Sequence, residues 1–222
     1  MIRVYKSPNI PASLASTASY DGEDVKQQLL ADQRGKCYIC ERCRDTDFEI
    51  EHYKSQNKHS GLIQDWNNLF MVCRYCNGKK SNDYDDILNP KDCNIEEEIE
   101  QRIDFIGKKA VFSSHVNDTE HAKTVELLNK VFNGSKCVRK IKEERFFERA
   151  ISIINRFSNL VYSYLENPSS EAETAIKSEL GIDRELLGFK YWMIHDNPSL
   201  FAVFANDMVW NKKTQNEGEC NT

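Results

Sequence analysis

The chain has 222 residues, of which 40% are hydrophobic and 29% charged, and its formal net charge is −5. This composition is typical of a folded globular protein and excludes a disordered chain. No apolar run approaches the roughly 20 residues that span a bilayer, and the first residues lack the apolar core of a signal peptide. We therefore expect a cytoplasmic protein with no membrane partner. The negative charge argues against a protein that coats nucleic acid by bulk electrostatics.

The first predicted unit, residues 1–33, consists of an extended arm followed by a helix. The arm covers residues 1–20, which are rich in serine and threonine and contain two prolines. The helix is expected to begin near Asp21 or Asp24, because acidic residues favour a helix start, and to end at Gly35.

The second unit, residues 34–91, is predicted to hold two short strands and a short helix. Residues 48–53 alternate between apolar and polar side chains, and residues 69–72 form a more apolar run. The polar segment after Cys76 predicts a helix that stops before Pro90. This unit contains ten Lys/Arg and nine Asp/Glu, so its net charge is +1 and the rest of the chain carries −6.

The third unit, residues 92–222, is expected to be mainly helical. Residues 104–112 indicate a strand, a turn and a second strand, and helical periodicity begins at Thr119 and continues to Pro168. One or two further helices are expected beyond that proline. The whole chain is therefore predicted to be an α+β protein that is mostly helical.

Four cysteines form two Cys-x-x-Cys pairs, Cys37 with Cys40 and Cys73 with Cys76. Cytosolic thiols stay reduced, and two such pairs can complete a tetrahedral thiolate site, so we predict a structural zinc ion. Cys43 follows the first pair closely, and we expect it not to be a ligand. For the remaining cysteines we expect positions in the core or the tail: Cys93, Cys137 and Cys220.

Three residues near these pairs have the side chains of a hydrolytic metal site. Glu51 and His52 lie between the pairs, and Asn77 follows the second pair directly. Carboxylate and amide oxygens suit Mg²⁺ or Mn²⁺ better than zinc, and a neutral histidine can take a proton from water. These groups suffice for metal-assisted phosphodiester hydrolysis. The alternative for His52 is a buried histidine with a structural role. No catalytic role is expected for the other histidines: His59, His115, His121 and His195.

The order of these motifs resembles the HNH endonucleases, with "CRYCNGKKSND" as the strongest match. The resemblance covers residues 34–91 and implies a zinc-clamped ββα-metal module. It implies that His52 is the general base, that Glu51 and Asn77 bind the catalytic metal, and that Asn68 braces the loop and orients the histidine. Glu51 stands where the family usually has aspartate, and Asn77 stands where a third histidine is more frequent.

Two lysines follow this motif at the end of the short predicted helix. Lys79 and Lys80 could reach phosphates of a bound nucleic acid, and the alternative is that they are solvated surface lysines.

The outer segments resemble the nuclease subunits of Septu-type antiphage systems, to which effectors of some retron systems are related. They include "IRVYKSPNIPASL", "DFIGKKAV" and "TVELLNKVFN". This resemblance implies an ATPase partner of the SMC/ABC type and, for a retron system, a reverse transcriptase with its RNA–DNA product. The helical region would then offer a docking surface for a partner, or would simply complete the core.

Two other functions remain open from the sequence. A standalone, restriction-type HNH nuclease would need no partner, whereas a zinc-ribbon adaptor would bind nucleic acid or protein without cutting and would not need His52. Among substrates we favour DNA over tRNA or other RNA.

Overall fold

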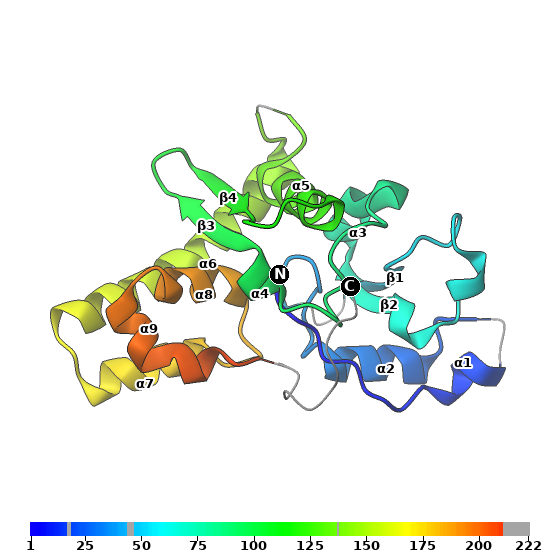
Figure 1. The fold of residues 1–222 in the computed structure, drawn as a ribbon, viewed down its shortest axis with the longest axis horizontal. Helices are drawn as coiled ribbons and strands as arrows, with labels where there is room; N and C mark the ends of the chain where they lie inside the picture. Colours follow the sequence, from blue (N-terminus) through cyan, green and yellow to red (C-terminus); the bar gives the residue numbers. More distant parts are fainter. Residues whose placement is uncertain (17–18, 44–46, 137, 211–222) are drawn as a thin grey trace.

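A computed structural model describes residues 1–16, 19–43, 47–136 and 138–210 (Figure 1). The chain is mostly helical and has two separate two-stranded sheets, so the predicted fold class is confirmed. No helix in these ranges is both long enough and apolar enough to cross a membrane. The predicted positions of Cys137 and Cys220 lie outside the described residues.

The first sheet and the helix after it form the ββα unit that was predicted. Strand β1 (Phe48–His52) pairs antiparallel with β2 (Leu69–Cys73), and His52 lies opposite Leu69. Every residue of β2 is buried, which explains its unbroken apolar run. Helix α3 (Arg74–Lys80) follows β2 at once, so it begins earlier than predicted. Short 3-10 helices lie in the adjoining loops: η1 (Ser60–Leu62), η2 (Trp66–Asn68) and η3 (Ser81–Asp83).

The N-terminal segment differs from a free arm, because much of it is buried. It contains a short helix, α1 (Ala12–Ser16), and is followed by α2 (Glu23–Asp32). Val4 is buried, and its N–H donates to the carbonyl of Pro90 at 2.7 Å. Gly35 has a φ of +67°, which favours glycine and agrees with its predicted role as a terminator.

The second sheet is a hairpin of β3 (Glu100–Asp104) and β4 (Lys109–Ser113), preceded by the short helix α4 (Ile95–Glu98). The predicted strand, turn and strand therefore exist, but the first strand begins at Glu100 rather than at residue 104. The sequence pattern placed the first strand too late, because the side chains of β3 are mostly polar and only Gln101 is fully buried.

The remaining elements are helices, as predicted, but three α-helices and one 3-10 helix follow Pro168 in the described part of the chain, where one or two helices were expected. Helix α5 has six buried residues in fifteen, and α6 buries one continuous face along its length. The bounds are α5 (Thr119–Asn133), α6 (Ile141–Glu166), α7 (Ser170–Glu179), α8 (Leu187–His195), α9 (Pro198–Phe204) and η4 (Ala205–Met208).

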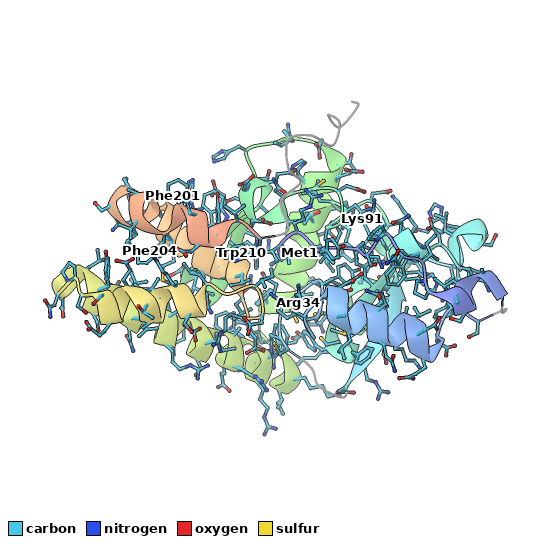
Figure 2. The ribbon with its side chains drawn as sticks, turned by 90° about the horizontal axis from the view of Figure 1, so that it is seen from below. Met1, Arg34, Lys91, Phe201, Phe204 and Trp210 are labelled. Carbon is cyan, nitrogen blue, oxygen red and sulfur yellow. The ribbon has the colours of Figure 1, made fainter. Side chains whose placement is uncertain are left out.

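One hydrophobic core joins parts of all three predicted units. It contains Met1 from the N-terminal segment, Phe70 from β2, and Phe132 and Phe146 from the helical region. Apolar side chains from α5 and α6 thus complete the core of the ββα unit, which is the simpler of the two roles expected for the helical region. Figure 2 shows Met1, Arg34 and Lys91 near the middle of the molecule, where these parts meet.

Candidate active site and metal centre

The four cysteines of the two pairs converge as predicted. Their ligand atoms all lie within 4.8 Å of one another, and the sulfurs of Cys40 and Cys73 are 3.9 Å apart. Zinc at about 2.3 Å from four tetrahedral sulfurs would space them by about 3.8 Å. All four residues are buried. This donor set and spacing fit a thiolate-bound metal ion, and structural zinc is the metal that such sites hold most often.

Backbone hydrogen bonds hold the two turns that carry these sulfurs. The N–H of Glu41 donates to the carbonyl of Cys37 at 2.8 Å and closes a tight turn around the first pair. Cys73 caps α3, and its sulfur accepts the N–H of Cys76 at 3.5 Å. The carboxylate of Glu41 also accepts the N–H of Gly188 at 3.0 Å, which ties this turn to α8.

Cys43 stands apart from the cysteine cluster, in agreement with its predicted exclusion. Its thiol lies 3.6 Å from the carbonyl of Asp183, and its N–H donates to Glu185 at 2.9 Å. This residue therefore contacts the loop before α8 rather than the four buried sulfurs.

The three residues predicted for hydrolysis meet at the end of β1. Successive strand residues point to opposite faces, so Glu51 faces α3 while His52 faces the N-terminal segment. Glu51, His52 and Asn77 nevertheless line one pocket of about 310 Å³. The other residues around it are mostly polar: Tyr20, Ile50, Ser55, Gln56, Asn57 and Asn82.

The hydrogen bonds of His52 identify its proton-accepting atom. Nε2 lies 2.9 Å from the carbonyl of Ile63, and a carbonyl only accepts, so Nε2 carries the hydrogen. Nδ1 then has a free lone pair, which accepts the amide of Gln56 at 3.0 Å. Burial lowers the pKa of His52, although the bond to Ile63 opposes this shift. The imidazole is therefore held neutral, with Nδ1 as the basic atom.

Asn68 braces the loop that follows His52. Its Oδ1 accepts the N–H of Lys54 at 2.7 Å, and its Nδ2 donates to the carbonyls of Lys54 and Leu62 at 3.0 and 3.1 Å. Asn68 does not line the pocket. Asn68 holds the loop that contains Ile63, whose carbonyl accepts the hydrogen bond from His52. Its effect on the histidine is therefore indirect.

The two lysines of α3 are not placed for the predicted phosphate contacts. The ammonium of Lys80 is fully buried, 2.8 Å from the carboxylate of Glu51 and 3.1 Å from the carbonyl of His52. Lys79 is paired with Glu143 at the start of α6. Tertiary packing thus gives both lysines partners within the chain, which their position in the sequence did not reveal.

Lys80 fixes the carboxylate that is predicted to bind metal. Burial raises the pKa of Glu51, and the Lys80 ammonium opposes this rise.

Removing one partner of a buried ion pair leaves the other charge poorly solvated. We expect Lys80→Met to lower the free energy of unfolding by about 3 kcal/mol in urea denaturation. The exposed residue Lys109 of β4 is the control, and equal stability of the Lys80→Met and Lys109→Met variants would contradict this role for Lys80.

Asn77 is oriented by a second carboxylate. Its Nδ2 donates to Glu49 at 2.6 Å, which leaves the amide oxygen as the atom available to a cation. Glu49 is also 3.9 Å from the guanidinium of Arg74. The sequence offered one signal for Glu49, because it precedes Glu51 by two residues and must share its face of the strand.

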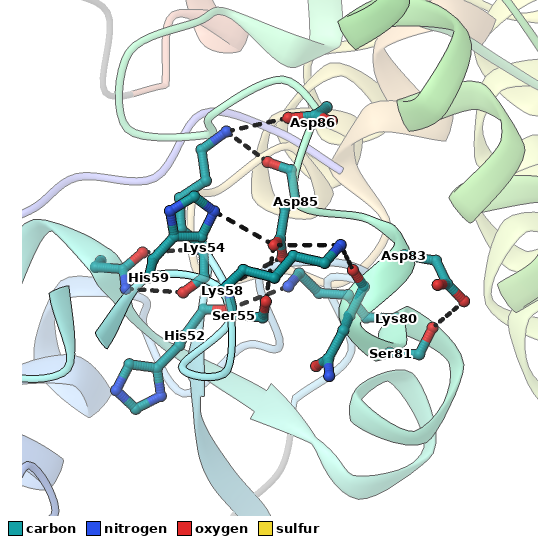
Figure 3. A network of polar contacts seen from close by, with 12 residues as sticks. His52, Lys54, Ser55, Lys58, His59, Lys80, Ser81, Asp83, Asp85 and Asp86 are labelled. Atoms are coloured by element: carbon teal, nitrogen blue, oxygen red, sulfur yellow. Dashed lines mark hydrogen bonds and ion pairs between the residues drawn. The ribbon is translucent and has the colours of Figure 1, made fainter. Parts of the chain in front are cut away.

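A polar network supports the loop after β1 (Figure 3). The buried carboxylate of Asp85 accepts the N–H and the hydroxyl of Ser55 at 2.9 and 2.7 Å. Lys58 and His59 approach the same carboxylate at 3.8 and 3.5 Å. Sequence reasoning missed Asp85 and also Tyr20, whose ring lies edge-on to His52 with centroids 4.5 Å apart. Both come from segments outside the two cysteine pairs, and no local pattern marks them.

Comparison with known proteins agrees with this geometry. Residues 40–83 match the family model described as HNH endonuclease. The chain is also 33% identical over 72 residues to the Septu protein PtuB of Bacillus thuringiensis, a match that covers 30% of this chain and 28% of that protein. The comparison with solved structures gave no significant match. Residues 40–83, with their two strands and helix, therefore form an HNH endonuclease family domain in a chain related to Septu PtuB.

Proposed function

We propose that the chain is a metal-dependent endonuclease that hydrolyses phosphodiester bonds of DNA. The observation that carries this proposal is that Glu51, His52 and Asn77 line one pocket within the segment that matches the HNH family. A simple zinc ribbon needs none of these three groups, so the non-catalytic adaptor is the weaker alternative.

His52 is the general base in this proposal. Its Nδ1 would take a proton from the water that attacks phosphorus, while the bond from Nε2 to the Ile63 carbonyl holds the ring and stabilises the positive charge it gains. The Gln56 amide donates a hydrogen bond to Nδ1 in this structure. This hydrogen bond must break before Nδ1 can accept a proton from the attacking water.

Glu51 and Asn77 would hold Mg²⁺ or Mn²⁺ through one carboxylate and one amide oxygen. The pocket fits such an ion, because its lining is polar and Glu49 already turns the Asn77 oxygen away from itself. When bound, the ion stabilises charge on the phosphate and on the leaving oxygen. Zinc would occupy the separate cysteine site and hold β1, β2 and α3 in place relative to one another.

We further propose that the chain works as the nuclease subunit of a Septu-type antiphage complex with an ATPase of the SMC/ABC type. The partial similarity to Septu PtuB supports this assignment. The comparisons offer no support for retron components, so a reverse transcriptase is not part of the proposal. A standalone restriction-type nuclease is the second candidate.

Cleavage by the purified chain, alone and co-expressed with the product of the neighbouring gene, tests the proposal. Plasmid DNA and a tRNA pool are incubated with Mg²⁺ or without added metal. We expect Mg²⁺-dependent cutting of plasmid that requires the partner. Cutting by the chain alone would favour the standalone nuclease, cutting of tRNA alone would replace the DNA assignment, and no cutting under any condition would favour the adaptor.

A further inference from the structure

Helix α6 presents a line of basic side chains to solvent. Lys142, Arg145 and Arg149 are exposed and lie three and four residues apart, so at 3.6 residues per turn they fall within about a sixth of the helix circumference. We call these three residues the α6 basic stripe. Arg156 continues the same line but interacts electrostatically with Glu179, so it is left out of the stripe.

The charges of the stripe are unpaired within the described part of the chain. Among residues 1–16, 19–43, 47–136 and 138–210, no carboxylate forms an ion pair with any of the three, whereas the neighbouring Arg139 pairs with Glu144 at 3.4 Å. Three free cations in a line are unexpected in a chain whose net charge is −5. Such a line attracts a partner with regularly spaced negative charge.

Helix α6, which carries the stripe, packs against α3, which contributes Asn77 to the candidate site. The ring of Phe146, next to Arg145, stacks on Tyr75 of α3 with centroids 4.4 Å apart. Glu143, next to Lys142, pairs with Lys79 of α3. Tyr75 and Lys79 share one face of α3, whereas Asn77 lies about 200° from Tyr75 around the helix and lines the pocket from the opposite face. The start of α6 therefore packs on the side of α3 that faces away from Asn77.

A further exposed arginine lies on α3, close to the pocket residues. Arg74 begins α3, and its side chain is 82% exposed. It approaches Glu49, the same carboxylate that holds the amide of Asn77. Arg74 therefore places one exposed positive charge beside a pocket-lining residue, on the helix against which α6 packs.

We propose that the α6 basic stripe binds the phosphate backbone of duplex DNA and guides it to the HNH pocket. This inference rests on the proposed nuclease function and extends its substrate surface beyond the HNH segment. From residue 142 to 149 the helix rises by about 10 Å, a length over which one strand of a duplex offers about three phosphates. The regular rise of a helix suits the regular phosphate spacing of a duplex.

The test is the affinity of the full chain for a fluorescent 30-base-pair duplex, measured by anisotropy in buffer without Mg²⁺ at several salt concentrations. The stripe variant combines Lys142→Gln, Arg145→Gln and Arg149→Gln. The control variant removes three charges from other helices: Lys123→Gln, Lys130→Gln and Lys177→Gln. Both variants have the same net charge, so a difference between them does not arise from net charge alone.

We expect the Kd of the stripe variant to rise about tenfold or more above that of the control at about 100 mM salt. The slope of log K against log salt should fall in magnitude by about 2.7, since each lost phosphate contact removes about 0.9. Equal affinity of the two variants would overturn the inference. So would a loss of affinity confined to a tRNA probe, or loss of the co-purified ATPase with unchanged DNA affinity.

Failure of this inference can be told from failure of the proposed function. In cleavage by the complete complex, the stripe variant should raise KM with little change in kcat, whereas His52→Ala should lower kcat and leave DNA affinity intact. If the stripe variant binds and cuts DNA like the control, the proposed nuclease function is retained and the proposed DNA binding by the stripe is wrong. A wild-type protein that neither binds nor cuts nucleic acid overturns both.

Discussion

Replacing Cys76 by serine is expected to destabilise the protein strongly, because it removes one of the four cysteines that would hold the predicted structural zinc ion. Cys76 is fully buried and offers one of four converging sulfurs. The binding free energy of a structural zinc ion is on the order of 10 kcal/mol, and it contributes to folding. Loss of one ligand should remove at least about 4 kcal/mol of stability and lower Tm by about 10 °C.

The measurement combines zinc content by mass spectrometry with thermal unfolding, and Cys43→Ser is the matched control. Cys43 lies in the same segment but outside the cluster, so its substitution should change stability by no more than about 0.5 kcal/mol and leave one zinc per chain. A Cys76→Ser protein with full zinc content and unchanged Tm would contradict the four-cysteine centre.

His52→Ala is expected to reduce the cleavage rate by about 10²-fold to 10⁴-fold, the contribution typical of a positioned general base. The loss is expected because Nδ1 is the proposed proton acceptor and His52 is the only histidine among the described residues that line the pocket. Single-turnover cleavage of plasmid DNA by the purified complex measures the chemical step directly.

His115→Ala is the matched control, since that imidazole is 90% exposed and belongs to the loop before α5. Because His52 is buried, His52→Asn serves as a second variant that keeps a polar group near the Ile63 carbonyl. Zinc content and thermal unfolding confirm that each variant is folded. Cleavage at the wild-type rate by a folded His52→Ala protein would exclude the histidine as the base.

The parts of this site that the sequence predicted are those encoded by short-range spacing. Each cysteine pair occupies one turn, and the N–H of Tyr38 in the first turn donates to the carbonyl of Met71 at 3.1 Å, which holds this turn against β2 and its last residue, Cys73. Glu51 and His52 end a strand whose alternation is visible in the sequence, and Asn77 follows Cys76 on α3. Local geometry is nearly sufficient to place all of these residues.

The parts that could not be predicted depend on contacts between distant segments. Gln56 is four residues from His52, but its amide reaches Nδ1 only because Asn68 and Asp85 shape the intervening loop. Lys80 looked like a surface lysine because it lies in a polar run, yet its ammonium is buried against Glu51. Such contacts depend on tertiary packing, and the hydrophobic periodicity of the sequence carries no information about them.

The net charge of the helical region was equally uninformative about its surface. Most of its aromatic residues are buried, in agreement with a core role for Phe189, Tyr191, Trp192, Phe204 and Trp210. The acidic total of residues outside the HNH segment nevertheless hides the basic stripe on α6, because a sum over a sequence does not report which charges share a face.

The most direct test of the central claim is binding of Mn²⁺ to the zinc-loaded protein, followed by electron paramagnetic resonance. This measurement reports the second metal site without depending on substrate, partner or trigger. We expect one tightly bound Mn²⁺ per chain in the wild type and loss of that ion in both Glu51→Gln and Asn77→Ala, with zinc retained. Absence of Mn²⁺ binding in the wild type, or binding that both substitutions leave unchanged, would contradict this expectation.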